Sequence, residues 1–278
     1  MMMKQGHPWM ATVMLAAFVA PAPAQEDVDL SETGKSALSA PAVLREGEPI
    51  LTYYNIMLGP DKVIGYIEAS LELAARDGQP AYRYHTYTEV HFPTRARLRV
   101  EVTAAMHANF EPIKIVLKRT VIQATGEETT SLQRAEFADD KVQMFGQVGD
   151  QEGGMKVSLP ARPLVYGIET LIQRLDFEKF PTFRLNEFDL QTGSARPLKV
   201  VASRWEDGTP TVITYNPDDT ISYQFWFDNE GSLTRWGEAS LPTLFVRTTK
   251  EAVEQWKAAK KAEAAPTGNT PSAPPPQP

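Results

Sequence analysis

The sequence predicts a mainly β protein: a strongly curved antiparallel sheet (a half-barrel), one central amphipathic helix packed on it, and a C-terminal helix. Three observations lead to this fold class. Short segments of alternating apolar and polar residues recur along most of the chain, separated by Gly, Pro, Asp and Asn. One segment in the middle changes to helical spacing. An Ala-, Glu- and Lys-rich segment then precedes the end of the chain.

The N-terminal residues have the three parts of a cleavable secretory signal. Lys4 is followed by a mostly apolar stretch from Trp9 to Val19 and then by Ala22-Pro23-Ala24. We expect residues 1–24 to be a signal peptide, favoured over an uncleaved anchor, and the protein to be exported to the periplasm or beyond. Residues 25–48 are polar and are predicted to be a flexible lead-in, and the Pro-rich residues 265–278 a disordered tail.

Composition excludes several classes of function. The chain has no cysteine, which rules out disulfides, thiolate metal sites and a cysteine nucleophile. A net charge of −7 argues against nucleic acid as a partner. The sequence shows no run of basic residues suited to a membrane surface and, after the signal, no stretch long enough to be an integral membrane segment. No phosphate loop, dinucleotide fingerprint or nucleophile elbow occurs, so we expect neither a cofactor nor catalysis.

Residues 49–248 are predicted to form the curved sheet. The alternating segments are 50–58, 63–74, 81–92, 95–105, 113–124, 131–138, 141–147, 155–159, 183–190, 198–205, 211–215, 220–228, 232–236 and 240–248. Asp228-Asn229-Glu230-Gly231 predicts a hairpin turn with glycine at a positive φ. Residues 249–264 are predicted to be the C-terminal helix, anchored by Val253 and Trp256.

The segment from Arg162 to Leu175 predicts the central helix. Six apolar residues share one helical stripe, with Glu169 and Gln173 opposite. The six are Leu164, Val165, Ile168, Leu171, Ile172 and Leu175. Pro163 fits the first turn, where its missing amide hydrogen is not needed. Because such a stripe must be buried, we expect the helix to lie against the sheet.

Several polar clusters have both a functional and a structural interpretation. His85, His91 and His107 could bind a metal, but six residues along a strand span about 20 Å, so we expect no metal site. Alternation places three arginines on one strand face, where they form either an anion-binding ladder or, as we favour, a solvated face paired with acidic neighbours. These are Arg95, Arg97 and Arg99. Asp218-Asp219 and Asp228-Asn229-Glu230 lack calcium-loop spacing, so we expect them to be turns.

An aromatic run, Tyr223-Gln224-Phe225-Trp226-Phe227, lies near Trp205, Trp236 and Tyr215. Alternation sends Tyr223, Phe225 and Phe227 to one face and Trp226 to the other. The run could line an apolar pocket or stack on sugars, although core packing is the favoured interpretation. No two carboxylates can be assigned from the sequence as the catalytic acid and base of a hydrolase. We considered Glu68, Glu72, Glu89, Glu101 and Asp207.

The order of these segments resembles that of exported bacterial half-barrel proteins, the group of the periplasmic lipoprotein carriers and related uncharacterised envelope proteins. The residues that carry the resemblance are Leu51-Thr52-Tyr53-Tyr54-Asn55-Ile56, then Ile64-Gly65-Tyr66-Ile67-Glu68, the central helix, and the closing Phe227-Asp228-Asn229-Glu230-Gly231-Ser232-Leu233. The resemblance implies a hollow that holds acyl chains beneath a helical lid. It transfers no individual acyl-binding residue.

Three functions remain open from the sequence. The favoured one is a non-enzymatic envelope protein that binds a lipid or lipoprotein acyl chain in the concave face. The residues expected to line that face are Leu164, Ile168, Leu171, Tyr223, Phe225 and Phe227. A structural or interaction module with a filled core, meeting other envelope proteins, is the alternative. An exported carbohydrate hydrolase with paired carboxylates is the third.

Overall fold

The computed structural model describes residues 28–29, 48–76, 79–138, 141–158, 164–205 and 208–264. The predicted signal peptide, the Pro-rich tail and most of the predicted lead-in lie outside these residues. Within the lead-in, Val28–Asp29 form the short strand β1. It pairs in parallel with β11 (Thr182–Asp189), a strand from the second half of the chain.

The chain forms two antiparallel meanders, which confirms the mainly β fold class. The first consists of β2 (Ile50–Leu58), β3 (Val63–Arg76), β4 (Gln79–His91), β5 (Arg97–His107), β6 (Pro112–Ile122), β7 (Glu128–Ala138), β8 (Lys141–Val148) and β9 (Gln151–Ser158). The second consists of β11, β12 (Ser194–Arg204), β13 (Pro210–Tyr215), β14 (Ile221–Phe227), β15 (Leu233–Glu238) and β16 (Thr243–Thr248). Alternation determines their faces: on β5, Val102, Ala104 and Met106 are buried while Glu101 and Thr103 are exposed.

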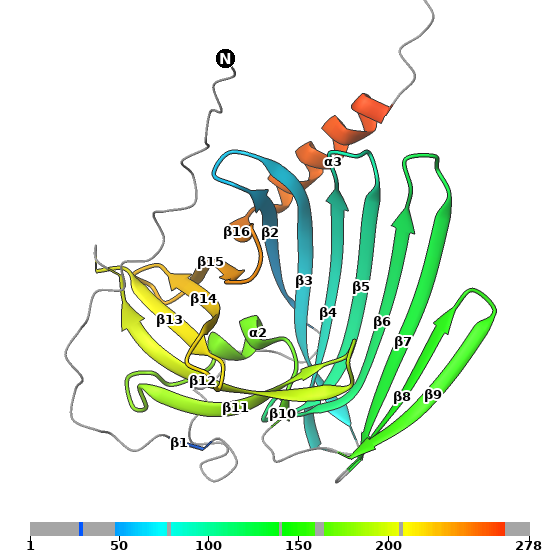
Figure 1. Ribbon diagram of the computed structural model, residues 1–278. Coiled ribbons are helices and arrows are strands. Elements are labelled where there is room, and N and C mark those ends of the chain that lie inside the picture. The colour runs from blue at the N-terminus through cyan, green and yellow to red at the C-terminus, as the bar shows by residue number, and fades with distance from the viewer. Residues whose placement is uncertain are drawn as a thin grey trace, which may run out of the picture.

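The last strand, β16, pairs with the first long strand, β2, and joins the two meanders into one 16-stranded sheet of the described residues. Phe245 lies opposite Ile56 in this pairing. The strand order ends with β9 on one side and with the short strands β1 and β10 on β11 on the other, and no backbone ladder joins these two edges in the described chain. Figure 1 shows the result, a strongly curved, open sheet in which β11 and β12 run across the lower part of the picture and β13–β16 lead up its left side to β2.

Side chains, not backbone hydrogen bonds, bring the two ends of the sheet together. Phe137 on β7 packs edge-on against Phe188 on β11, with ring centroids 4.8 Å apart. Between β11 and β12, Gly193 faces Met144 of β8 so closely that an added Cβ would lie 2.4 Å from the methionine sulfur. The sheet therefore encloses a core that includes residues of both meanders.

The central helix is much shorter than predicted. The structure forms a strand, β10 (Leu164–Val165), followed by a five-residue helix, α2 (Ile168–Ile172), so the expectation of one helix from Arg162 to Leu175 is wrong. β10 pairs in parallel with β11, and Gly167 then takes a left-handed conformation with φ 73° before the helix begins. Backbone pairing at a sheet edge thus replaces the first predicted helical turn.

The apolar stripe is nevertheless buried. Val165, Ile168, Leu171, Ile172 and Leu175 all belong to the main core, and Figure 1 shows α2 inside the curve of the sheet. The described structure does not extend to the side chain of Leu164. Burial of each large apolar side chain contributes about 1.5–3 kcal/mol before the loss of chain entropy. The prediction of a central helix packed on the sheet is therefore confirmed, although its extent is not.

The C-terminal helix α3 (Lys250–Ala264) lies on the outer face of the sheet. The hydroxyl of Thr249 accepts a hydrogen bond from the amide of Ala252 and caps its N-terminus. Val253 is buried, and the ring of Trp256 packs against Tyr66 at 5.4 Å, so both predicted anchors contact the protein. No helix in the described ranges is long and apolar enough to cross a membrane.

Gly65 provides a test of the close approach of β3 to β4. A Cβ there would lie 2.2 Å from the carbonyl oxygen of Glu89. Because the obstacle is backbone, we expect Gly65→Ala to lower the free energy of unfolding by about 1–3 kcal/mol, measured by urea denaturation. The matched control is Gly146→Ala on β8, where a Cβ meets nothing within 4 Å. Equal stability of the two variants would contradict this account of the sheet.

Candidate functional site

A cavity of about 270 Å³ remains between α2 and the inner face of β2–β4. Its apolar lining comprises Ile50, Ile67, Ala69, Leu71, Ile168, Phe188 and Trp236. Its polar lining comprises Thr52, Tyr54, Ser70, Tyr84, Thr86, Thr88, Tyr166, Glu169, Thr170, Gln173, Arg174, Glu187 and Tyr223. The cavity is therefore amphipathic, with hydroxyl groups as its most frequent polar groups.

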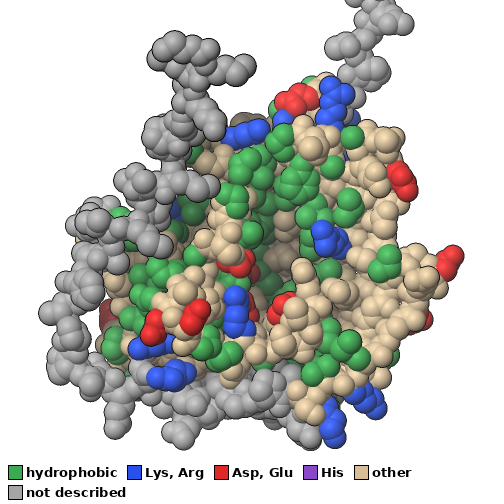
Figure 2. Space-filling model, in the orientation of Figure 1, with side chains coloured by type: hydrophobic (Ala, Val, Ile, Leu, Met, Phe, Trp, Pro, Cys, Tyr) green, Lys and Arg blue, Asp and Glu red, His purple; other side chains and the backbone are tan. Residues whose placement is uncertain are grey.

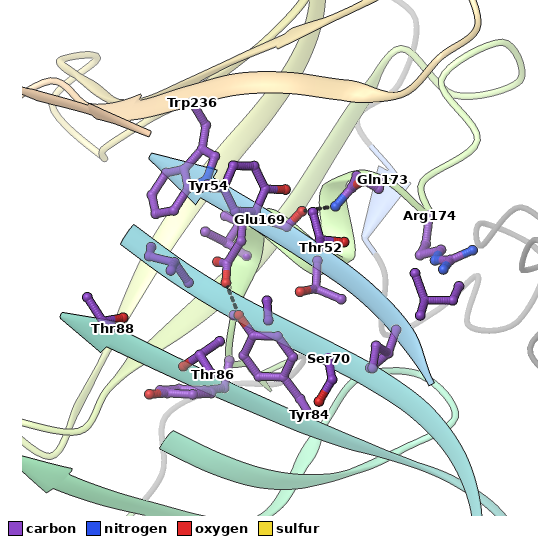
Figure 3. Close-up of a pocket in the computed structure, with 18 of the residues that line it drawn as sticks. Thr52, Tyr54, Ser70, Tyr84, Thr86, Thr88, Glu169, Gln173, Arg174 and Trp236 are labelled. Carbon is purple, nitrogen blue, oxygen red and sulfur yellow. Dashed lines mark hydrogen bonds between the residues drawn. The ribbon is translucent and has the colours of Figure 1, made fainter. Parts of the chain in front are cut away.

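Glu169 of α2 and Tyr84 of β4 meet inside this cavity. The Tyr84 hydroxyl donates a hydrogen bond to the Glu169 carboxyl, and Figure 3 shows the two side chains pointing toward one another. Gln173 donates to the backbone carbonyl oxygen of Glu169 at 2.9 Å. The turn at Gly167 makes this approach possible, because a Cβ there would lie 3.2 Å from the Tyr84 ring. The sequence interpretation placed Glu169 opposite the buried stripe, and that opposite side faces the cavity.

Burial determines the protonation of this pair. It raises the pKa of Glu169, and the hydrogen bond from Tyr84 only partly opposes that rise. Burial, followed by the nearby Glu169 charge, raises the pKa of Tyr84 well above its ordinary range. The pKa values of Tyr54 and Tyr166 are also raised, first by burial and then by Glu169. The cavity therefore favours neutral forms of these groups.

A second acid, Glu187 of β11, lines the same cavity, but a neighbouring cation balances its charge. The Arg196 guanidinium of β12 forms an ion pair with Glu187 and donates to the Tyr223 hydroxyl at 3.0 Å. The Tyr223 hydroxyl in turn lies 3.3 Å from the Glu187 carboxylate. Burial raises the pKa of Glu187, while Arg196 opposes the rise. This three-residue network fixes one wall of the cavity.

The residues predicted from the sequence to line a hollow divide into two groups. Ile168 and Tyr223 line the cavity. Leu171, Phe225 and Phe227 are buried in the core beside it. Leu164 belongs to β10, and its side chain lies outside the description. Sequence alternation found the inward face of β14 but did not identify Glu169, Tyr84 or Glu187, because no motif marks them.

The histidines contact carboxylates on the outer face. His91 lies 2.8 Å from Glu89, and His85 lies 3.3 Å from Glu101. Within the described ranges, no group of three His, Cys, Asp or Glu residues is placed to hold a metal ion.

The other polar clusters mostly have structural roles. Arg99 pairs with Glu89 at 3.5 Å, as the solvated-face interpretation predicts, whereas Arg95 lies in the β4–β5 turn and not on a strand. Asp218 accepts from the amide of Thr220, and Asp228 from the amides of Glu230 and Ser232, which is turn chemistry. The carboxylates considered as catalytic groups have partners: Glu68 pairs with Lys257, Glu72 with Arg83, Glu89 with His91 and Glu101 with His85. Asp207 lies outside the described residues.

The raised pKa of Glu169 predicts how stability depends on pH. On unfolding, this pKa returns to its ordinary value near 4.5. The folded chain therefore binds more protons above pH 4.5, and the free energy of unfolding falls as pH rises through the folded pKa. Glu169→Gln keeps an acceptor for Tyr84 but cannot ionise. We expect its stability relative to the wild type to increase across this interval, measured by urea denaturation at a series of pH values.

The control for losing a carboxyl group is Glu178→Gln, at an exposed position shortly after α2. If the free energies of unfolding of the wild type and of Glu169→Gln change in parallel from acidic to neutral pH, the Glu169 carboxyl is not desolvated in solution.

No protein-family model matches the chain, and no curated protein matches it. One solved structure that is similar is a β-barrel-like protein of a domain of unknown function, DUF1849, from Brucella abortus. It shares 10% sequence identity at a TM-score of 0.47, over 74% of this chain and 97% of that one. The resemblance to the lipoprotein-carrier group stays a prediction.

Proposed function

We propose that this chain is an exported, non-enzymatic envelope protein that binds the acyl chain of a lipid or lipoprotein. The cavity between α2 and β2–β4 is the observation that carries the proposal. It combines an apolar lining with a hydrogen-bonding cluster around Glu169 and Tyr84. Such a combination suits a ligand with a hydrocarbon part and one polar group.

The surface beyond the cavity is also apolar. Leu58, Ile67, Leu98 and Phe245 are half-buried and pack around Ile56 and Val90 on the same stretch of sheet. Figure 2 shows hydrophobic side chains gathered over the upper part of the hollowed face, above the position of α2. A chain that enters the cavity therefore has apolar surface along which to extend.

The volume limits the ligand to one chain. Pockets that enclose small molecules measure about 300–1,000 Å³. At about 270 Å³ the cavity lies just below that range, so it accommodates one hydrocarbon chain or its end and leaves the remainder of a lipid outside. The filled core beneath it, including Leu171 and Ile172, leaves no room for several chains.

The electrostatics favour a neutral polar group over an anion. Glu169 and Glu187 both have a raised pKa, which shows that the cavity resists negative charge. An ester or amide carbonyl accepts hydrogen bonds without adding charge. We therefore expect an esterified acyl chain to bind more tightly than the ionised fatty acid.

Filling the cavity tests the proposal. Ala69→Leu adds bulk to the cavity wall, whereas Ala74→Leu makes the same change on β3 outside the lining. We expect Ala69→Leu to weaken uptake of fluorescent cis-parinaric acid about tenfold, which corresponds to about 1.4 kcal/mol, and Ala74→Leu to leave uptake unchanged. Methyl palmitate should displace the probe at lower concentration than palmitate does.

Native mass spectrometry before and after delipidation provides the second measurement. The proposal predicts a co-purifying lipid in the wild type. If neither a bound lipid nor probe uptake is detected, the cavity belongs to a filled core, and the alternative of a structural or interaction module holds instead.

A further inference from the structure

A second and larger cleft, about 1,120 Å³, lies between α3 and the ends of the long strands. Its walls come from four segments far apart in the sequence: the β2–β3, β4–β5 and β6–β7 turns and the last turns of α3. Figure 1 shows these three turns and the C-terminal end of α3 at the same end of the sheet. The cleft is separate from the cavity at α2, with which it shares no lining residue.

The lining of this cleft is strongly basic although the chain is acidic. Its cations are Lys62, Arg95, Arg97, Lys257, Lys260 and Lys261, against the two carboxylates of Glu89 and Glu263. The whole chain has a net charge of −7, so positive charge is concentrated at this end of an otherwise negative molecule. Charge separation of this kind creates a local field that attracts anions.

Four of these six cations have no ionic partner among the residues that the structure describes. Lys257 pairs with Glu68 and Glu254, and Lys260 with Glu263. The described part of the chain offers no side-chain hydrogen bond or ion pair to the other four, Lys62, Arg95, Arg97 and Lys261. Four unpaired cations around one cleft repel one another unless an external anion neutralises them.

Arg95 occupies a backbone conformation that favours glycine. It lies at the tip of the β4–β5 turn with φ 67°. In this turn the Phe92 amide donates a hydrogen bond to the Ala96 carbonyl, and the Arg95 amide donates one to the Phe92 carbonyl. A left-handed conformation costs a residue with a side chain about 1–2 kcal/mol. Nothing within the described protein pairs with its guanidinium in return.

Aromatic side chains accompany the cations. Phe92 at the same tip is 42% exposed. Trp256 lines the cleft from α3, with its ring 4.9 Å from His91 and 5.4 Å from Tyr66. Aromatic rings beside lysine and arginine suit the boundary between lipid headgroups and acyl chains.

We propose that this end of the molecule, formed by the three turns and α3, docks onto an anionic lipid bilayer surface. A soluble phosphate ligand requires donors that converge on one point, whereas these cations are distributed over three segments along a wide cleft. An exposed phenylalanine at the tip adds an apolar contact that a soluble anion does not need. This inference does not depend on the acyl-binding proposal.

Cosedimentation with vesicles tests the docking surface. One set contains phosphatidylcholine alone and the other equal parts of phosphatidylcholine and phosphatidylglycerol. We expect the full chain to bind only the second set, with affinity that falls as salt rises. Each cation removed should reduce binding about fivefold, so Arg95→Gly together with Arg97→Gln and Lys261→Gln should reduce it about a hundredfold.

Arg95→Gly by itself separates binding from folding. Because glycine adopts positive φ without strain, we expect this variant to unfold no more easily than the wild type while binding anionic vesicles about fivefold less tightly. Asp219→Gly is the matched control, since Asp219 also has a positive φ, 61°, in the β13–β14 turn. Lys156→Gln removes one cation from β9, an edge strand that does not line the cleft. Neither control should weaken vesicle binding.

Several outcomes would overturn the docking surface. These are equal binding to both sets of vesicles, unchanged binding by the triple variant, an equal loss with Lys156→Gln, or binding to free glycerophosphate or duplex DNA in place of vesicles. Ala69→Leu, which fills the α2 cavity, should leave vesicle binding unchanged. Failure of the acyl-binding proposal is therefore distinguishable from failure of this one.

Discussion

The interaction on which this structure depends is the burial of the segment Val165–Leu175 inside the curve of the sheet. The two ends of the sheet are not joined by a backbone ladder in the described chain, so the contact between them consists of side chains. Apolar residues of this segment pack against β4, β5 and β11–β14 in one continuous core. Without them, the inner faces of both meanders would be exposed to water, and the hydrophobic contribution to curling the sheet would be lost.

The same segment explains why a cavity remains. Gly167 ends the backbone pairing of β10 and starts a helix of only five residues. A helix this short buries Ile168, Leu171 and Ile172 on one side but cannot fill the space on its other side. Glu169 therefore projects toward β4 and bonds to Tyr84. Burying an acid without a full counter-charge is costly, and such groups are more often found at binding sites than in ordinary cores.

Polar character is distributed unequally over the molecule. Burial raises the pKa values of Glu169 and Tyr84 in the inner cavity, which favours their neutral forms. The outer cleft beside α3 concentrates cations, four of which have no ionic partner among the described residues. The two proposed sites, an acyl-binding cavity and a surface that docks on anionic membranes, are compatible on one protein. A protein that takes an acyl chain from a membrane first meets the lipid headgroups.

The sequence by itself determined the strands, because alternation with period two and the Gly, Pro, Asp and Asn breaks are local signals. Its prediction for β2 matches the structure at both ends, and the predicted turn at Asp228 forms with Gly231 at φ 78°. It also identified the buried stripe at Val165–Leu175, since burial on one side requires apolar residues. Only the tertiary structure decided that this stripe begins as a strand, that β16 pairs with β2, and that Glu169 meets Tyr84. Those features depend on contacts between residues 22 or more positions apart, which no local pattern encodes.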